Sequence, residues 1–154
     1  MTEDQKKLAL EILETALDIT VSTNRPDGWP QATTVSFVSD GLDIYFGTWS
    51  HSQKVANIER DGRVSVAVNA PYKAWNEIRS LSLAGEAAFV TDANELLRVG
   101  QLMMKRFGQE LAKQATFDMT QTQVVRIRPK IISILDYAKG FGHTELVTVE
   151  PPKR

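Results

Sequence analysis

The chain has 154 residues, a formal net charge of −1, no cysteine, and 42% hydrophobic and 24% charged residues. This length and composition predict one globular domain over residues 1–150 with a frayed tail at residues 151–154. Without cysteine, and with His51 and His143 far apart in sequence, we expect no disulfide and no bound metal. The balanced charge and the lack of a long apolar run argue against nucleic-acid and membrane partners and favour a cytoplasmic protein.

The first part of the chain predicts a helix and two strands. Thr2 and Gln5 form a capping box before a helix that ends near Leu17. Residues 19–23 alternate in the manner of a strand, and a turn at residues 26–28 leads back into a second strand. We therefore expect a peripheral helix followed by a β meander.

The central stretch predicts a hairpin, a hydroxyl-rich elbow and a short helix. The second strand is expected to continue through Phe37, and Asp40-Gly41 is a strong hairpin signal. The elbow is the segment Gly47-Thr48-Trp49-Ser50-His51-Ser52, and it leads into a helix over residues 52–60 with Ser52 as N-cap. A strand over residues 63–69 follows.

The C-terminal half predicts further strands around one long helix. A strand over residues 78–90 contains Gly85, which indicates a bulge. Asp92 and Glu95 begin a helix that carries Leu96, Leu97, Leu102, Met103 and Phe107 and is expected to end at Gly108. Pro129 is expected to separate the next two strands, over residues 123–128 and 131–137, and residues 146–149 form a last strand.

These elements predict a mainly β fold, an antiparallel split β-barrel of six to seven strands with about three peripheral helices. Alternating βαβ units are absent, which argues against a parallel doubly wound sheet. The usual catalytic motifs are also absent, so we name no catalytic residue and favour a bound cofactor as the source of any chemistry.

Lys54 is the most informative residue of the elbow region. A cation in the first turn of a helix opposes the helix dipole, at a cost of about 0.3–1 kcal/mol. An anion held by Thr48, Ser50, Ser52, Gln53 and Lys54 would remove that cost. The alternative is a plain N-capped helix with an exposed lysine. The aromatic residues Trp49, Tyr72 and Trp75 suit either stacking on a planar cofactor ring or packing in the core or an interface.

Three motifs follow one another along the chain: DGLDIYFGT, SxSxKVxNIxRDxRVSV, and a W-x-E-I-R strand. With these motifs the sequence resembles the pyridoxamine 5'-phosphate oxidase-like family of FMN-binding split β-barrels. It implies a homodimer with FMN at the subunit interface and a small-molecule substrate. It also implies cofactor-binding roles for the matching positions Thr33, Thr34, Val35, Gly47, Thr48, Ser52, Gln53, Lys54, Trp75 and Ser80, with Lys54 as the phosphate ligand supported by Ser52.

Three positions depart from the pattern that the resemblance implies. Thr33 and Gln53 replace arginines, and Ser80 replaces a glutamine. The family's C-terminal substrate motif is also missing, which argues against vitamin biosynthesis. The leading hypothesis is an FMN-dependent oxidoreductase transferring hydride or electrons.

Two alternatives remain open. The first is a non-catalytic flavin, deazaflavin or haem binding protein, in which His143 on the Gly140-Phe141-Gly142 loop would approach a haem iron. The second is a barrel dimer that serves only as a scaffold.

Overall fold

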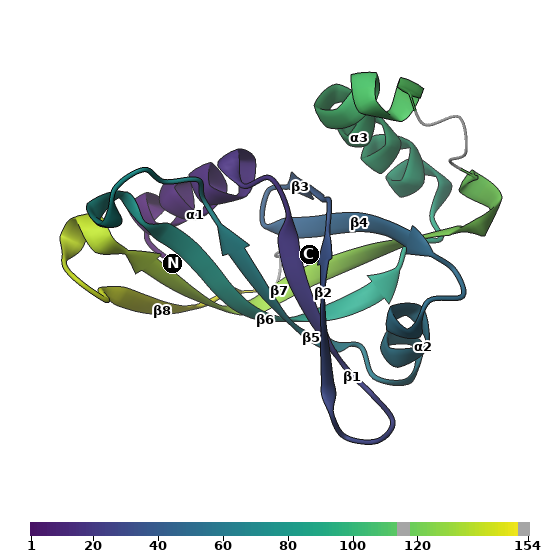
Figure 1. Ribbon diagram of the computed structural model, residues 1–154, viewed down its shortest axis with the longest axis horizontal. Helices are drawn as coiled ribbons and strands as arrows, with labels where there is room; N and C mark the ends of the chain where they lie inside the picture. The colour runs from purple at the N-terminus through teal and green to yellow at the C-terminus, as the bar shows by residue number, and fades with distance from the viewer. Residues whose placement is uncertain (114–117, 151–154) are drawn as a thin grey trace.

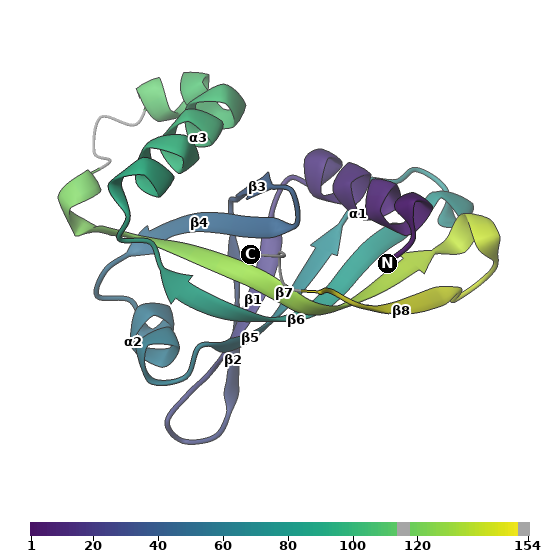
Figure 2. The same cartoon turned by 180° about the vertical axis from the view of Figure 1, so that it is seen from behind.

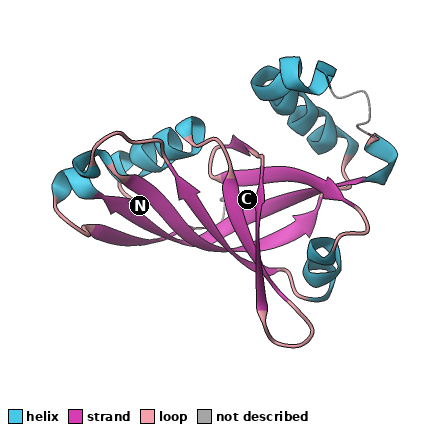
Figure 3. Ribbon diagram, in the orientation of Figure 1, coloured by secondary structure: helices cyan, strands magenta, loops and turns pink. Residues whose placement is uncertain are grey.

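The computed structural model describes residues 1–113 and 118–150, so the tail predicted at residues 151–154 lies outside the described residues. One curled antiparallel sheet forms a half-barrel, and the helices lie around it (Figures 1 and 3). The strands are β1 (Ile19–Asn24), β2 (Pro30–Val35), β3 (Val38–Asp40), β4 (Asp43–Trp49), β5 (Arg63–Asn69), β6 (Arg79–Phe89), β7 (Thr122–Asp136) and β8 (Thr144–Thr148). Their order is β2-β1-β5-β6-β7-β4-β3, with β8 paired to β7. This architecture confirms the predicted fold class.

The three α-helices are α1 (Glu3–Thr15), α2 (Gln53–Arg60) and α3 (Ala93–Lys113), and short 3₁₀ turns form η1 (Trp75–Glu77), η2 (Met119–Gln121) and η3 (Tyr137–Lys139). In Figure 1, α1 and the connection from β5 to β6 occupy one end of the molecule, and α2 lies at the other end beside the long β1–β2 hairpin. Figure 2 shows β8 and the start of α1 at the same end from behind. No helix in the described part of the chain is long and apolar enough to cross a bilayer.

Local signals set the boundaries of several elements as predicted. The Thr2 hydroxyl and the Gln5 side chain form the capping box of α1. The hairpin turns at Gly41, whose φ of 59° is the left-handed conformation that glycine favours. Helix α2 and strand β5 also begin and end where the sequence predicts them.

The main core lies between α1 and the concave face of the sheet. Ala9, Ile12 and Leu13 of α1 are buried against inward-facing residues of the strands, including Val66 and Leu81. Complete burial of one such aliphatic side chain contributes about 1.5–3 kcal/mol to folding. Leu17, expected on this apolar face, is 74% exposed because α1 ends at Thr15 and the chain leaves the helix before it.

The strand predicted to run from Gln31 through Phe37 toward the Asp40-Gly41 turn is broken into two. Strand β2 pairs with β1, whereas β3 pairs with β4, so the chain changes partner at Ser36 and Phe37. The Phe37 side chain is fully buried in the main core. Burial of this ring at the corner between the two pairings accounts for the break.

Strand β7 passes through Pro129, where a separation into two strands was expected. The pairing of β6 with β7 shifts by one residue between Ala84, opposite Ile131, and Gly85, opposite Pro129. A Cβ atom at position 85 would lie 2.7 Å from the carbonyl oxygen of Arg128. The irregularity predicted at Gly85 is therefore confirmed, but the extra residue of the bulge is Lys130 in β7, opposite Gly85. This bulge accommodates the proline within the strand.

Helix α3 continues past Gly108, where it was expected to end. Gly108 lacks the positive φ that a glycine C-cap requires, and the helix runs to Lys113. Its packed face consists of Val99, Leu102, Met103 and Phe107, which contact the cluster containing Val38, Tyr45 and Val90. Leu97 was expected on this face but is 64% exposed.

Candidate functional site

The elbow connects the end of β4 to the first turn of α2. Ser50 N donates to the Gln121 carbonyl at 2.9 Å, and Ser52 N donates to the Trp49 carbonyl at 3.0 Å. The Ser52 hydroxyl oxygen accepts from Val55 N at 3.3 Å, which confirms the predicted N-cap. Thr48 Oγ1 lies 3.5 Å from Ser52 Oγ, so two hydroxyls stand together where α2 begins.

Lys54 is buried in the first turn of α2, with only 8% of its surface exposed. Desolvation by this burial lowers the pKa of the ammonium. Its amine forms no hydrogen bond or ion pair with any residue that the structure describes. This burial contradicts the alternative of an exposed lysine on a plain N-capped helix. The ammonium at the end of the largely buried side chain has no counter-charge among the described residues.

Gln53 turns its amide toward α2 itself. Its Nε2 donates to Asn57 Oδ1 at 2.9 Å. Asn57 is fully buried, and its Nδ2 donates to Thr23 Oγ1 at 3.0 Å and to Gln31 Oε1 at 3.2 Å. The Asn57 network, defined as Gln53, Asn57, Thr23 and Gln31, therefore ties α2 to the β1–β2 hairpin.

Asn57 was not among the predicted site residues. A signal was present, because Asn57 lies three residues after Lys54 and beside Ile58 on one side of the helix. A polar residue on the apolar side of a short helix indicates a buried hydrogen-bonding partner.

The predicted residues of β2 lie on the strand that Asn57 contacts. Thr33 is two positions beyond Gln31 and shares its half-buried face, whereas Thr34 is exposed and Val35 packs against the main core. Among the described residues, Thr33 Oγ1 is a buried side-chain oxygen without a hydrogen-bond partner. A buried hydroxyl without a hydrogen-bond partner costs about 1–3 kcal/mol of folding free energy unless a bound group supplies the missing hydrogen bond.

Gly47 lies in β4 opposite Val124 of β7. A Cβ atom added there would lie 3.2 Å from Thr122 Cγ2, so the glycine permits a close approach between the two strands.

Trp75 and Ser80 lie away from the elbow. Ser80 pairs with Asn69 at the end of β5, whereas α2 joins the other end of that strand, about 20 Å away for six residues of extended chain. Trp75 precedes β6 at the same end and is 71% exposed. One chain therefore gathers Thr48, Ser52 and Lys54 at the elbow but does not bring Trp75 and Ser80 to them.

Two of the aromatic residues singled out in the sequence are exposed. Trp49 is 58% exposed and Tyr72 is 55% exposed, so neither of them is a core residue. Trp49 Nε1 donates to Gln121 Oε1 at 3.4 Å, which holds the indole against η2.

His143 lies in a polar cluster at the end of the molecule occupied by α1. Its Nε2 lies 3.0 Å from Glu145 Oε1, and the same carboxylate accepts from Lys139 Nζ and Gln5 Nε2, each at 2.9 Å. These contacts lower the pKa of Glu145 to about 2. His143 therefore already holds a carboxylate through one of its ring nitrogens.

A curled antiparallel half-barrel with peripheral helices is the architecture of the split β-barrel class. The sequence profile described as pyridoxamine 5'-phosphate oxidase matches residues 6–136. The chain therefore belongs to the pyridoxamine 5'-phosphate oxidase family. A comparison with curated proteins finds no match.

Solved structures share the fold. A conserved hypothetical protein from Mycobacterium tuberculosis is 27% identical, with a TM-score of 0.73, over 99% of this chain and 94% of the other. A heme binding protein from Mycobacterium smegmatis is 19% identical, with a TM-score of 0.80, over 96% of this chain and 59% of the other. The heme storage protein HutZ from Vibrio cholerae is 19% identical, with a TM-score of 0.64, over 82% of this chain and 89% of the other.

Proposed function

We propose that the protein is an FMN-dependent oxidoreductase that holds the phosphate of its flavin at the elbow. The observation that carries this proposal is the largely buried Lys54 side chain, whose ammonium has no counter-charge among the described residues. A dianionic phosphate would supply that charge, and the free N–H groups in the first turn of α2 suit the same ligand.

The remaining elbow groups fit a phosphate in part. The hydroxyls of Thr48 and Ser52 stand 3.5 Å apart and are able to donate to phosphate oxygens. Gln53, by contrast, uses its amide on Asn57 and leaves Lys54 as the cationic ligand. The orphan hydroxyl of Thr33 on β2 suits a hydrogen bond to a polar edge of the flavin ring.

The proposed site is completed by a second copy of the chain, because Trp75 and Ser80 lie at the other end of β5 from the elbow. The outer face of β5 and β6 supports such an assembly. Ser65 pairs with Ala84 and Ala67 pairs with Ser82, and all four small side chains are exposed. A face of small residues permits close approach of another sheet, with the Trp75 indole available for stacking on the ring.

The flavin, when bound, supplies hydride or electron transfer to a small substrate. The chain itself binds the phosphate through Lys54, Thr48 and Ser52 and orients the ring along β2. We propose the cytoplasm as the location, in keeping with a chain that contains no cysteine.

The test is a titration of FMN into the protein, followed by fluorescence, with Lys54→Ala and the exposed control Lys105→Ala. We expect Lys54→Ala to weaken FMN binding at least about tenfold, or about 1.4 kcal/mol, and Lys105→Ala to bind as the unmodified protein does. Equal affinity for all three proteins would remove Lys54 from the site.

A haem or deazaflavin carrier is the second candidate. It is favoured by the shared fold of the heme binding protein from Mycobacterium smegmatis and of HutZ. The cluster around His143 weighs against haem ligation there, since iron would compete with Glu145 for the imidazole. Absorption spectra after addition of haem, deazaflavin or FMN and gel filtration separate the cases, and a haem spectrum lost in His143→Ala would replace the flavin proposal.

A further inference from the structure

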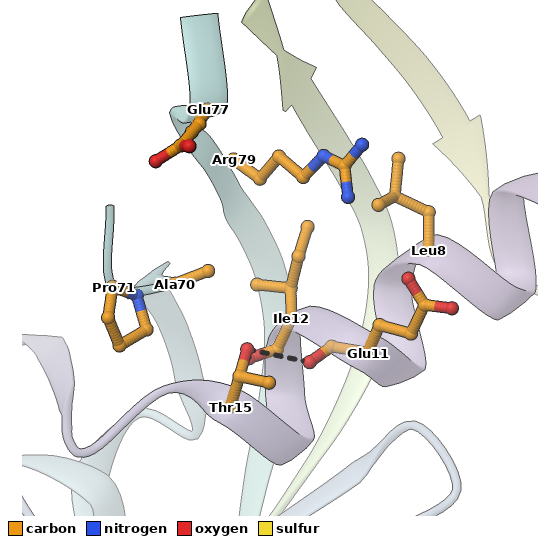
Figure 4. A pocket seen from close by; sticks show the side chains of 8 residues that line it. All are labelled: Leu8, Glu11, Ile12, Thr15, Ala70, Pro71, Glu77 and Arg79. Carbon is orange, nitrogen blue, oxygen red and sulfur yellow. Dashed lines mark hydrogen bonds between the residues drawn. The ribbon is translucent and has the colours of Figure 1, made fainter. Parts of the chain in front are cut away.

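A hollow of about 370 Å³ lies between α1 and the segment that joins β5 to β6 (Figure 4). These two elements lie at the opposite end of the molecule from α2 (Figure 1). We call it the α1 hollow; its lining residues include Leu8, Glu11, Ile12, Pro71, Glu77 and Arg79. It adjoins a second hollow of about 300 Å³, which shares Leu8, Glu11 and Arg79. Its size is that of a site for a small organic molecule.

Arg79 presents its guanidinium to the α1 hollow. Figure 4 shows this group beside Ile12 and Leu8. Its Nε donates to Asp136 Oδ1 at 3.2 Å, and Asp136 is nearly fully buried. This buried carboxylate therefore fixes the orientation of the guanidinium. Neither terminal nitrogen donates to another residue in the described ranges. Two parallel N–H groups are therefore free to bind a carboxylate.

Glu11 supplies the opposite charge on the α1 side of the same hollow. Its carboxylate makes no ion pair with Arg79 or with any other residue of the described ranges. Glu77 differs, because its Oε2 accepts from the backbone N–H groups of Lys73 and Ala74 at 3.0 and 3.2 Å. One cation and two carboxylates thus line a single small space, and of the two carboxylates Glu11 is the one without a partner among the described residues.

We propose that the α1 hollow binds a free α-amino acid with an apolar side chain. The ligand carboxylate binds the terminal nitrogens of Arg79, and its ammonium binds Glu11. The side chain packs on Leu8, Ile12 and Pro71, which form the apolar wall of the hollow. A ligand with both charges satisfies both groups, whereas a simple acid or amine leaves one of them without a partner. This site is independent of the elbow.

The experiment uses amide NMR spectra of the full chain with L-leucine as the probe. Isocaproate lacks the ammonium of leucine, and isoamylamine lacks its carboxylate. We expect leucine to shift the amides of Leu8, Ile12 and Ala70, and each truncated probe to bind at least about tenfold more weakly. Equal affinity for leucine and either truncated probe overturns the proposal, as does the absence of shifts at about 10 mM leucine.

Variants assign the two contacts. Glu11→Gln is expected to weaken leucine at least about tenfold and to leave isocaproate unchanged, while Glu14→Gln, an exposed residue on the same helix outside both hollows, changes neither. Arg79→Gln is expected to abolish binding of leucine and isocaproate.

Arg79→Lys keeps the charge beside Asp136 but loses the planar pair of donors, so weakened leucine binding in this variant also supports the contact of the carboxylate with Arg79. Unchanged leucine affinity in Glu11→Gln contradicts the contact of the ammonium with Glu11. Unchanged leucine affinity in Arg79→Lys contradicts the contact of the carboxylate with Arg79.

Discussion

Lys54 and Asn57 lie about one turn apart on the buried side of α2, and their polar groups are satisfied differently. Asn57 makes three hydrogen bonds to neighbouring side chains. Lys54 makes none with the described residues and loses hydration by burial. At the scale of single residues, the fold supplies hydrogen-bond partners to Asn57 and leaves the Lys54 ammonium available to an anion.

Asn57→Ala is expected to destabilise the protein by about 1–3 kcal/mol, because it leaves Thr23 and Gln31 without their shared donor in a buried site. Urea unfolding followed by circular dichroism measures the change. Asn94→Ala, at an exposed position of α3, is the control and is expected to stay within about 0.5 kcal/mol. Equal effects at the two positions would show that the Asn57 network contributes little to stability.

Elements fixed by neighbouring residues were predictable from the sequence, and those fixed by distant contacts were not. The caps of α1 and α2 and the Asp40-Gly41 hairpin depend on side chains within four residues. The end of β2, in contrast, depends on where Phe37 is buried, and the continuity of β7 depends on Gly85 in another strand.

The same distinction applies to the candidate site. The Ser52 cap is local and follows from the sequence. The burial of Lys54 depends on packing of α2 against β1, which no local pattern contains.

Gly85→Ala tests the bulge at the scale of elements. The new methyl group would meet the Arg128 carbonyl oxygen at 2.7 Å, so we expect destabilisation of about 1–3 kcal/mol. Gly100→Ala is the matched control, because nothing lies within 4 Å of the new Cβ atom on α3. There we expect stabilisation of about 0.5–1 kcal/mol from the helix preference of alanine. Thermal unfolding of both variants measures the difference, and an equal response would contradict the close contact at the bulge.

At the scale of the whole molecule, the two ends carry different chemistry. The elbow and the Asn57 network lie with α2, while the α1 hollow and the Glu145 cluster lie with α1 (Figure 1). A second copy that brought Trp75 and Ser80 to the elbow would place an α1 end close to an α2 end.

The homodimer is tested by equilibrium sedimentation at micromolar concentration. We expect a mass of twice the 17.2 kDa of one chain. Ser82→Arg, on the exposed face of β6, is expected to shift the mass toward one chain, and Lys105→Arg to leave it unchanged. A mass of 17.2 kDa for the unmodified protein would contradict the assembly.

Acid is expected to weaken the α1 end of the molecule. The folded pKa of Glu145 is about 2, below its ordinary value of 4.5, so the folded state holds this proton less tightly than the unfolded state. Its contribution is complete above the ordinary value and is lost as the pH falls toward about 2. Urea unfolding at several pH values is expected to show that the stability gap between the unmodified protein and Glu145→Gln narrows over this range. A constant gap would contradict the assignment.

The bulge in β7 also determines where the chain tolerates a change in length. Buried positions fall on Val125, Ile127 and Pro129 before the bulge and on Ile132 and Ile134 after it, so the alternation changes phase at Lys130 and Ile131. Deleting Lys130 would restore an unbroken two-residue period and keep both sets of apolar side chains inward. Deleting Ser133 would turn the residues beyond it outward. Strand β7 therefore contains a position at which one residue can be lost while its apolar side chains still face the interior of the half-barrel.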